Sequence, residues 1–376
     1  MKLIFNKLKK FSNSQERKLK SEMSSDDTGV IHLDTVTHFY PNDSVPTIEN
    51  LDLLVKHGEF ISILGESGAG KTTTLRMIAG FEKISSGYLR IGGQLVGSNF
   101  LHVPPNHRNL GVVFQDYALF PHMTVYKNIE FGMNNKIDDK TDIINNILTM
   151  VGMHGYEDKY VHELSGGQQQ RVAIARAVAI NPIALLLDEP FSNLDRMLAR
   201  ELRKDIKKIV TNTKTTTILV THDREEALAI SDRVAVVSNR KILQIDTPEY
   251  IYNNPLSPEV ARLVGPCDFI DGEYKNNSVT TSFGKFSAKS LEKIDDNQKV
   301  KVLIRPSDVN ICNQVNENFS NRIISREYRG EYDEYEILSE KGEVIHSRMN
   351  NVENILADSK VQVNLNKNRS VIVYKN

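Results

Sequence analysis

Residues 60–72 read Phe60-Ile61-Ser62-Ile63-Leu64-Gly65-Glu66-Ser67-Gly68-Ala69-Gly70-Lys71-Thr72, and this stretch decides the fold. An apolar run leads into a segment that fits G-x-x-x-x-G-K-[ST] at every fixed position. A strand that feeds a glycine-rich loop and then a helix places several backbone N–H groups around one point, at the positive end of the helix dipole. The stretch therefore predicts a site for a nucleoside triphosphate.

Glycines are needed in such a loop because a Cβ would block the backbone from curling round the anion. Lys71 can place a point charge on the β- and γ-phosphates, and the Thr72 hydroxyl can bind Mg²⁺. A chance glycine-rich turn is the alternative, and the helical run 73–78 that follows argues against it. The loop alone does not separate a kinase, a GTPase, a helicase and a transport ATPase. The residues predicted to surround the nucleotide here are Gly65, Glu66, Ser67, Gly68, Ala69, Gly70, Lys71, Thr72 and Thr73.

Composition describes a soluble globular protein of two or three domains, since the chain has 376 residues with 40% hydrophobic and 25% charged side chains. The net charge of −1 provides no global basic field, so a nucleic-acid partner is not expected. Two cysteines, Cys267 and Cys312, are too few for a disulfide framework. No apolar stretch reaches the roughly 20 residues that a membrane-spanning helix needs.

Residues 1–28 are predicted to form a disordered N-terminal extension. Their first twenty residues alternate apolar side chains with lysines, which also fits a short amphipathic helix on an anionic membrane surface. A translation start at Met23 is a further alternative, because that residue precedes the beginning of the first domain.

Strand and helix patterns alternate from Ile31 onward, which is typical of a parallel sheet covered by helices. After residue 264 short β-rich segments such as 300–304 and 361–365 predict a small barrel or sandwich. The strands predicted before that point are 31–39, 48–55, 60–64, 110–114, 184–187 and 216–220, and the helices are 73–78, 139–155, 168–180 and 198–210.

Two adjacent carboxylates, Asp188 and Glu189, follow the apolar run 184–187. Beside a phosphate loop they can divide the chemistry, with Asp188 in the Mg²⁺ shell and Glu189 polarising the attacking water. The alternative is a pair of strand-end acids that cap the next segment.

A second glycine-rich element, Leu164-Ser165-Gly166-Gly167-Gln168, opens a helix and offers another anion-binding end. If both anion-binding helix ends served one nucleotide within one subunit, the second end would be redundant. A head-to-tail homodimer, in which each subunit's second loop closes over its partner's triphosphate, explains the pair better than a simple helix cap does.

Together these motifs, with His222 after the strand 216–220, resemble the ATPase subunit of an ABC transporter over roughly residues 31–265. The resemblance implies that Tyr40 stacks on adenine, or else Phe39, and that Gln115 reaches both Mg²⁺ and the attacking water. It makes Glu189, His222 and Gln115 the catalytic residues and Thr72, Gln115 and Asp188 the metal ligands. Further nucleotide contacts implied by the family are Ser165, Gly166, Gly167, Gln168 and, in the loop that crosses the dimer interface, Asp195.

The resemblance implies an α/β P-loop NTPase domain over 29–264, with a helical subdomain at about 116–180. Residues 302–309 and 327–330 resemble a TOBE-like, OB-like all-β domain of importer ATPases, which we place at 265–376. Ser307 stands where that element more often has Glu. Residues 114–122 and 188–195 look most like the ferric-iron branch, so ferric iron is the predicted solute. Polyamine, sulfate, phosphonate and sugar import are the alternatives.

The implied partners are integral membrane permease subunits and a periplasmic or surface solute-binding protein, with ATP and Mg²⁺ as cofactors. The implied location is peripheral, on the cytoplasmic face of the plasma membrane. Soluble ABC-type ATPases that act on nucleic acid or the ribosome share the same motifs. They usually carry two ATPase halves, coiled-coil insertions or basic extensions, whereas this chain has one copy of each motif and a near-neutral charge. A metabolic kinase would have no use for the second glycine-rich loop.

Overall fold

The computed structural model describes residues 29–133, 140–312, 321–350, 355–366 and 369–376. The predicted N-terminal extension, residues 1–28, lies outside them. The chain divides into two compact units, one made of residues 1–61 and 70–220 and the other of residues 62–69 and 221–376. Strand β3 (Phe60–Leu64) begins in the first unit and ends in the second.

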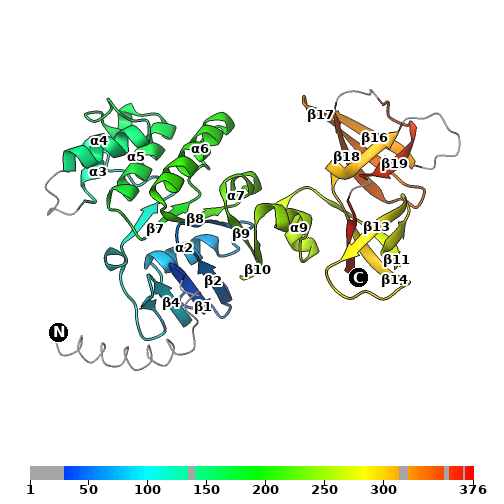
Figure 1. The fold of residues 1–376 in the computed structure, drawn as a ribbon, viewed down its shortest axis with the longest axis horizontal. Helices are drawn as coiled ribbons and strands as arrows, with labels where there is room; N and C mark the ends of the chain where they lie inside the picture. Colours follow the sequence, from blue (N-terminus) through cyan, green and yellow to red (C-terminus); the bar gives the residue numbers. More distant parts are fainter. Residues whose placement is uncertain (1–28, 134–139, 313–320, 351–354, 367–368) are drawn as a thin grey trace. The chain divides into compact units, whose positions relative to one another are not determined.

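The first unit contains two sheets (Figure 1). One runs in the order β2-β1-β4-β5, and the other runs from β3 through β8 and β7 to β6. In the second sheet β6, β7 and β8 are parallel, and the aliphatic residues of β7 and β8 are buried, as expected for strands covered on both faces. The bounds are β1 Ile31–His38, β2 Ile48–Val55, β4 Ser86–Ile91, β5 Gln94–Gly97, β6 Leu110–Val113, β7 Ala184–Asp188 and β8 Thr216–Thr221.

The first two predicted strands exist, but their assignment to the parallel sheet was wrong. β1 and β2 pair antiparallel with each other, and β1 also pairs antiparallel with β4. The connection over residues 39–47 is too short to carry a crossover, which parallel neighbours require. Strands β4 and β5, which complete this sheet, were not predicted.

Helices α3, α4 and α5 pack together in the first unit, with α6 beside α5 (Figure 1). Their shared core includes Val125, Ile144, Leu148 and Val172, all fully buried. Helix α4 ends at Met150, five residues before the predicted end, because Gly152 adopts a positive φ of 68°. The helices are α2 Lys71–Ala79, α3 Val125–Glu130, α4 Lys140–Met150, α5 Gly166–Ala179 and α6 Arg196–Thr213, with short 3₁₀ turns at Pro105–His107 and Val161–Glu163.

The second unit begins with the end of β3, which pairs with β9, and β9 pairs with β10. Three helices accompany these strands, and their apolar faces form one buried cluster with β9 that includes Val236, Ile251 and Val260. The elements are α7 Arg224–Ile230, β9 Arg233–Ser238, β10 Lys241–Asp246, α8 Pro248–Asn253 and α9 Pro258–Val264.

A closed five-stranded barrel follows, in the order β11-β12-β13-β20-β14, together with a five-stranded sheet in the order β15-β19-β16-β17-β18 (Figure 1). The predicted small barrel is therefore confirmed, and the second sheet adds to it. The predicted boundary near residue 264 falls between α9 and β11, where helical structure gives way to strands. The bounds are β11 Asp268–Lys275, β12 Ser278–Thr281, β13 Gly284–Ser290, β14 Gln298–Ile304, β15 Val309–Cys312, β16 Asn321–Tyr328, β17 Tyr332–Leu338, β18 Val344–Asn350, β19 Lys360–Leu365 and β20 Val371–Lys375, with a 3₁₀ turn, η3, at Pro306–Asp308.

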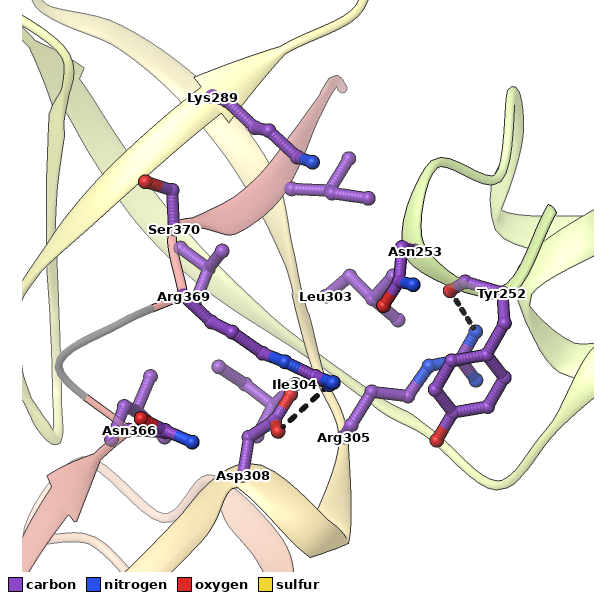
Figure 2. A pocket seen from close by; sticks show the side chains of 13 residues that line it. Tyr252, Asn253, Lys289, Leu303, Ile304, Arg305, Asp308, Asn366, Arg369 and Ser370 are labelled. Atoms are coloured by element: carbon purple, nitrogen blue, oxygen red, sulfur yellow. Dashed lines mark hydrogen bonds and ion pairs between the residues drawn. The ribbon is translucent and has the colours of Figure 1, made fainter. Parts of the chain in front are cut away.

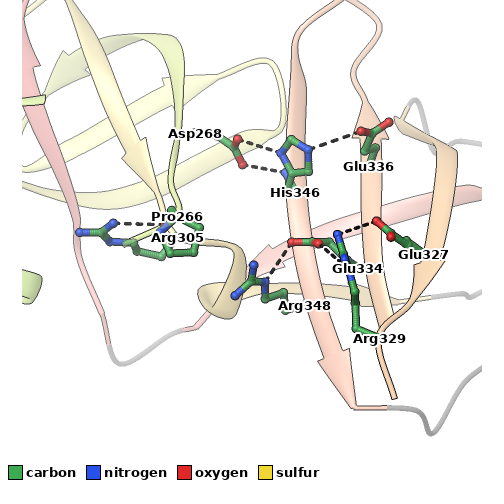
Figure 3. Close-up of polar contacts among 9 residues, drawn as sticks. All are labelled: Pro266, Asp268, Arg305, Glu327, Arg329, Glu334, Glu336, His346 and Arg348. Atoms are coloured by element: carbon green, nitrogen blue, oxygen red, sulfur yellow. Dashed lines mark hydrogen bonds and ion pairs between the residues drawn. The ribbon is translucent and has the colours of Figure 1, made fainter. Parts of the chain in front are cut away.

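One histidine joins the barrel to the second sheet (Figure 3). His346 on β18 has its Nδ1 2.9 Å from Asp268 Oδ1 on β11, and its backbone N–H donates to Asp268 Oδ2 at 2.7 Å. Its Nε2 lies 3.6 Å from Glu336 Oε1 on β17. Partial burial works to lower the pKa of His346, but the hydrogen bond to Asp268 and the nearby carboxylates outweigh burial and raise it above 6.5. The protonated imidazole therefore strengthens this connection.

Candidate active site

Helix α2 starts at the end of the glycine-rich loop, where Gly70 is the N-cap with a φ of 92°. A Cβ at Gly70 would lie 2.3 Å from Ile48 Cδ1, so both the backbone conformation and the space require glycine. The loop residues 65–69 belong to the second unit and are joined to Gly70 by a peptide bond. Within them Ala69 N–H donates to Glu66 O at 3.2 Å, which forms a tight turn.

Lys71 is the first residue of α2 and is 4% exposed. Burial lowers the pKa of its ammonium group, and the carboxylates of Glu189 and Asp188 partly offset that effect. A bound triphosphate would place its oxygens next to this buried ammonium group and would compensate its positive charge where water has little access.

The other end of α2 is held by Arg108, which is 3% exposed. Its Nη1 donates to Met77 O at 2.7 Å and to Ile78 O at 2.8 Å, and its Nε donates to Val103 O at 2.7 Å. Burial lowers the pKa of this guanidinium to about 10, so it stays charged at neutral pH. A cation on the last carbonyls satisfies the helix end and complements its dipole.

Thr72 and Asp188 meet across the site, with the Thr72 hydroxyl donating to Asp188 Oδ1 at 3.1 Å. Burial raises the pKa of Asp188, and the neighbouring charge of Glu189 raises it further, while the Thr72 hydrogen bond and Lys71 oppose the shift. A hydroxyl and a carboxylate oxygen are ligands that Mg²⁺ prefers, with phosphate and water in the remaining positions. Among the described residues no three His, Cys, Asp or Glu side chains form a metal cluster.

Glu189 follows directly and adopts a φ of 44°, a left-handed conformation that is unusual for a glutamate. Its N–H donates to Val220 O at 2.9 Å, and its carbonyl accepts hydrogen bonds from the backbone N–H and the hydroxyl of Ser192 at 3.3 and 3.0 Å. These bonds fix the strained backbone, and such strain is characteristic of functional sites.

Gln115 lies next to the loop that follows Glu189. Its Nε2 is 3.4 Å from Ser192 Oγ, and its carbonyl accepts from Asn193 Nδ2 at 3.1 Å. The residues after it are held by Arg176 of α5, whose guanidinium donates to Ala118 O at 2.7 Å and to Tyr117 O at 2.9 Å. Both acceptor residues have positive φ angles, so Arg176 stabilises an otherwise unfavourable turn.

The second glycine-rich turn forms a capping box at the start of α5. Ser165 Oγ accepts from Gln168 N–H at 3.4 Å, and Gln168 Oε1 accepts from Ser165 N–H at 2.9 Å. Each of these two side chains accepts from the backbone N–H of the other residue, so together they cap the start of α5. Gly167 approaches α6 closely, since a Cβ there would lie 2.7 Å from Leu198 Cδ2. Ser165 and Gly166 are exposed in this turn.

The remaining predicted residues have distinct local positions. The Tyr40 hydroxyl is 3.2 Å from Thr73 Oγ1, which puts the ring beside α2. Asp195 is the N-cap of α6 and accepts from Leu198 N–H at 3.0 Å. In the second unit, His222 is exposed in the turn between β8 and α7. The structure thus joins Thr72 to Asp188, Gln115 to the loop after Glu189, and Tyr40 to Thr73.

Sequence reasoning missed Arg108 and Arg176. Both are partly or fully buried arginines that donate to backbone carbonyls. A backbone carbonyl does not depend on the type of side chain, so its position cannot be read from the sequence. Arg176 stands in an apolar stretch, which was a signal for a buried arginine, whereas Arg108 stands between His107 and Asn109 and gave none.

Known proteins resemble this chain in sequence. The family model described as "ABC transporter" matches residues 48–192. The chain is 39% identical over 81% of its length to the spermidine/putrescine import ATP-binding protein PotA of Borreliella afzelii, covering 87% of that protein. It is 37% identical over 93% of its length to PotA of Mesoplasma florum, covering 99%, and 40% identical over 85% to PotA of Acetivibrio thermocellus, covering 90%.

Solved structures resemble the chain as well. The dimeric bacterial ABC transporter cassette MJ0796 matches 58% of the chain and 98% of its own length, with a TM-score of 0.51 and 30% identity. The structure of cbiO1 from Clostridium perfringens, described as part of the ABC transporter complex cbiONQ, matches 63% of the chain and 94% of its own length, with a TM-score of 0.55 and 27% identity.

Proposed function

This chain belongs to the ABC transporter family as an ATPase subunit that powers import, and from that premise we propose that its solute is a polyamine of the spermidine and putrescine class. Support comes from relatives that span nearly the whole chain, since the Mesoplasma florum importer ATPase aligns over 93% of it. The comparisons favour polyamine import over ferric-iron import. The ferric-iron prediction rested on a few loop residues, which are not expected to contact the solute.

For hydrolysis, we propose that the buried Lys71 and the start of α2 hold the phosphates. Mg²⁺, held by Thr72 and Asp188 and reached by Gln115, would supply positive charge at the triphosphate. Glu189 would accept a proton from the attacking water, and His222 would contact the γ-phosphate. The observation that supports this assignment is the 3.1 Å hydrogen bond from Thr72 to Asp188, with Glu189 fixed in a strained backbone next to it.

We also propose that two copies of this chain form a head-to-tail dimer on permease partners at the cytoplasmic face of the membrane, with a solute-binding protein outside. The dimer is supported by the similarity to the ABC transporter cassette MJ0796, whose solved structure is dimeric, while Ser165 and Gly166 are exposed in this chain. No helix in the described part of the chain is long and apolar enough to cross a bilayer. After hydrolysis the contacts of the γ-phosphate would be lost and the dimer would open.

The test is solute uptake by cells that express this chain with the membrane subunits that copurify with it. We expect wild type to take up radiolabelled spermidine and Glu189→Gln to lose that uptake, with ATP binding retained and hydrolysis reduced about 10²–10⁴-fold. Glu201→Gln, on the exposed face of α6, is the matched control. If ferric-iron uptake depended on Glu189 and spermidine uptake did not, the polyamine assignment would be wrong.

A further inference from the structure

A pocket of about 440 Å³ lies in the second unit and includes none of the residues assigned to the nucleotide (Figure 2). Its size is within the range of small-molecule sites. Five parts of the unit line it: the end of α8, strand β13, the end of β14 with η3, the end of β19 and the start of β20.

Positive charge predominates in this pocket. Lys289, Arg305 and Arg369 contribute three cations, against a single carboxylate, Asp308. The three cations come from separate segments of the unit, as Figure 2 shows. Cations that come together from distant parts of a chain repel one another, and this repulsion destabilises the folded state unless an anion compensates it.

Arg305 carries most of this cost because it is 5% exposed. Its Nη1 donates to Ala261 O and Gly265 O, both at 2.9 Å, and its guanidinium stacks 4.3 Å from the centre of the Tyr252 ring. These partners are neutral, and its Nε is buried without a hydrogen bond. Burial lowers the pKa of this guanidinium, and the nearby charge of Asp308 opposes that shift.

The other two cations are only weakly compensated. Lys289 Nζ donates to the neutral Asn254 Oδ1 at 2.7 Å. Arg369 Nη1 lies 3.2 Å from Asp308 Oδ1, but its side chain is 50% exposed, and an exposed pair of this kind contributes little. A small anion could therefore displace or join these contacts at low cost.

From this geometry we propose that the pocket binds a small phosphorylated organic anion. Lys289 and Arg369 would contact the phosphate group, since both line the pocket as exposed or half-buried donors. Arg305 would supply a buried positive charge beneath it. The carbon skeleton would lie against the apolar wall of Leu303, Ile304, Val371 and Ile372. The bound anion would connect α8 to the barrel.

Calorimetric titration tests this site. Because phosphate can also enter the nucleotide loop, the protein is the full-length Glu189→Gln variant saturated with ATP and Mg²⁺. The probes are inorganic phosphate, glycerol 3-phosphate, glycerate and uncharged glycerol. We expect glycerol 3-phosphate to bind more tightly than inorganic phosphate and glycerate, and glycerol not to bind.

Variants locate the binding. In that background, Lys289→Gln and Arg369→Gln should each weaken glycerol 3-phosphate about tenfold, the value of one charge-assisted hydrogen bond. Asp308→Asn should tighten it about threefold, because it frees Arg369. Lys285→Gln, on the same strand but outside the pocket lining, should change nothing. Thermal melting confirms that each variant is folded.

Three results would overturn the proposal. The first is no binding of any phosphate probe to the ATP-saturated protein. The second is binding that Lys285→Gln weakens as much as Lys289→Gln does. The third is unchanged affinity in Asp308→Asn together with unchanged affinity in Arg369→Gln. None of these results bears on the polyamine assignment, which uptake measures.

Discussion

Replacing Arg176 with methionine should release the segment that follows Gln115 while leaving nucleotide binding intact. Arg176 makes two charged hydrogen bonds, at 2.7 and 2.9 Å, to Ala118 O and Tyr117 O. A hydrogen bond from a charged donor contributes about 1.5–3 kcal/mol, so the lower value for two bonds gives about 3 kcal/mol. Since 1.4 kcal/mol is a tenfold change, local opening should become roughly 150-fold more frequent.

Amide hydrogen exchange, followed by mass spectrometry on a peptide covering residues 114–121, measures this opening directly. Arg200→Met is the matched control, because Arg200 is exposed on α6. Protection of residues 117–120 should fall in Arg176→Met and stay at the wild-type level in the control. Equal protection in the two variants would refute the reasoning, since the turn would then be held by something other than Arg176.

Three further predictions concern the metal ligands, the helical part and the barrel. Thr72→Val should weaken ATP binding in the presence of Mg²⁺ by about tenfold or more, because the hydroxyl that we propose as a Mg²⁺ ligand is lost. Thr72→Ser keeps that hydroxyl and should not weaken binding, and equilibrium binding of a fluorescent ATP analogue distinguishes the two variants. Gln170→Met should raise the free energy of unfolding by about 1 kcal/mol, since both polar atoms of the Gln170 amide are buried without a hydrogen-bond partner. Gln169→Met should lower the free energy of unfolding, because the Gln169 amide donates to two carbonyls. Urea denaturation followed by circular dichroism measures both changes. His346, whose pKa is raised in the folded state, should stabilise the protein fully below pH 6.5 and progressively less as the pH rises through the folded-state pKa. If the free energy of unfolding depends on pH in the same way in His346→Asn as in wild type, this prediction is wrong.

The phosphate loop and the acids could be predicted because short-range patterns determine them. Glycine at position 70 is required by its own φ, which follows from the strand–loop–helix sequence, and the close approach of Ile48 on β2 adds a second, tertiary reason. Asp188 and Glu189 were found from the apolar run before them, since such a run ends at the edge of a buried sheet.

Partner choice between strands was harder to predict. The apolar patterns of β1 and β2 are the same whether the strands pair parallel or antiparallel, and only the length of their connection distinguishes the cases. The arginines that hold α2 and the turn after Gln115 bond to carbonyls far away in the sequence, so no local pattern could reveal them. The solute was the least predictable, because loop residues near the nucleotide carry no chemistry of the transported molecule.

The left-handed backbone of Glu189 is unfavourable for folding, although its carboxylate is the group that we propose as the base for hydrolysis. Glycine or asparagine would occupy this conformation at a lower energetic cost. If Glu189 acts as proposed, a substitution that relieves this strain would give a protein that is more stable but no longer hydrolyses ATP.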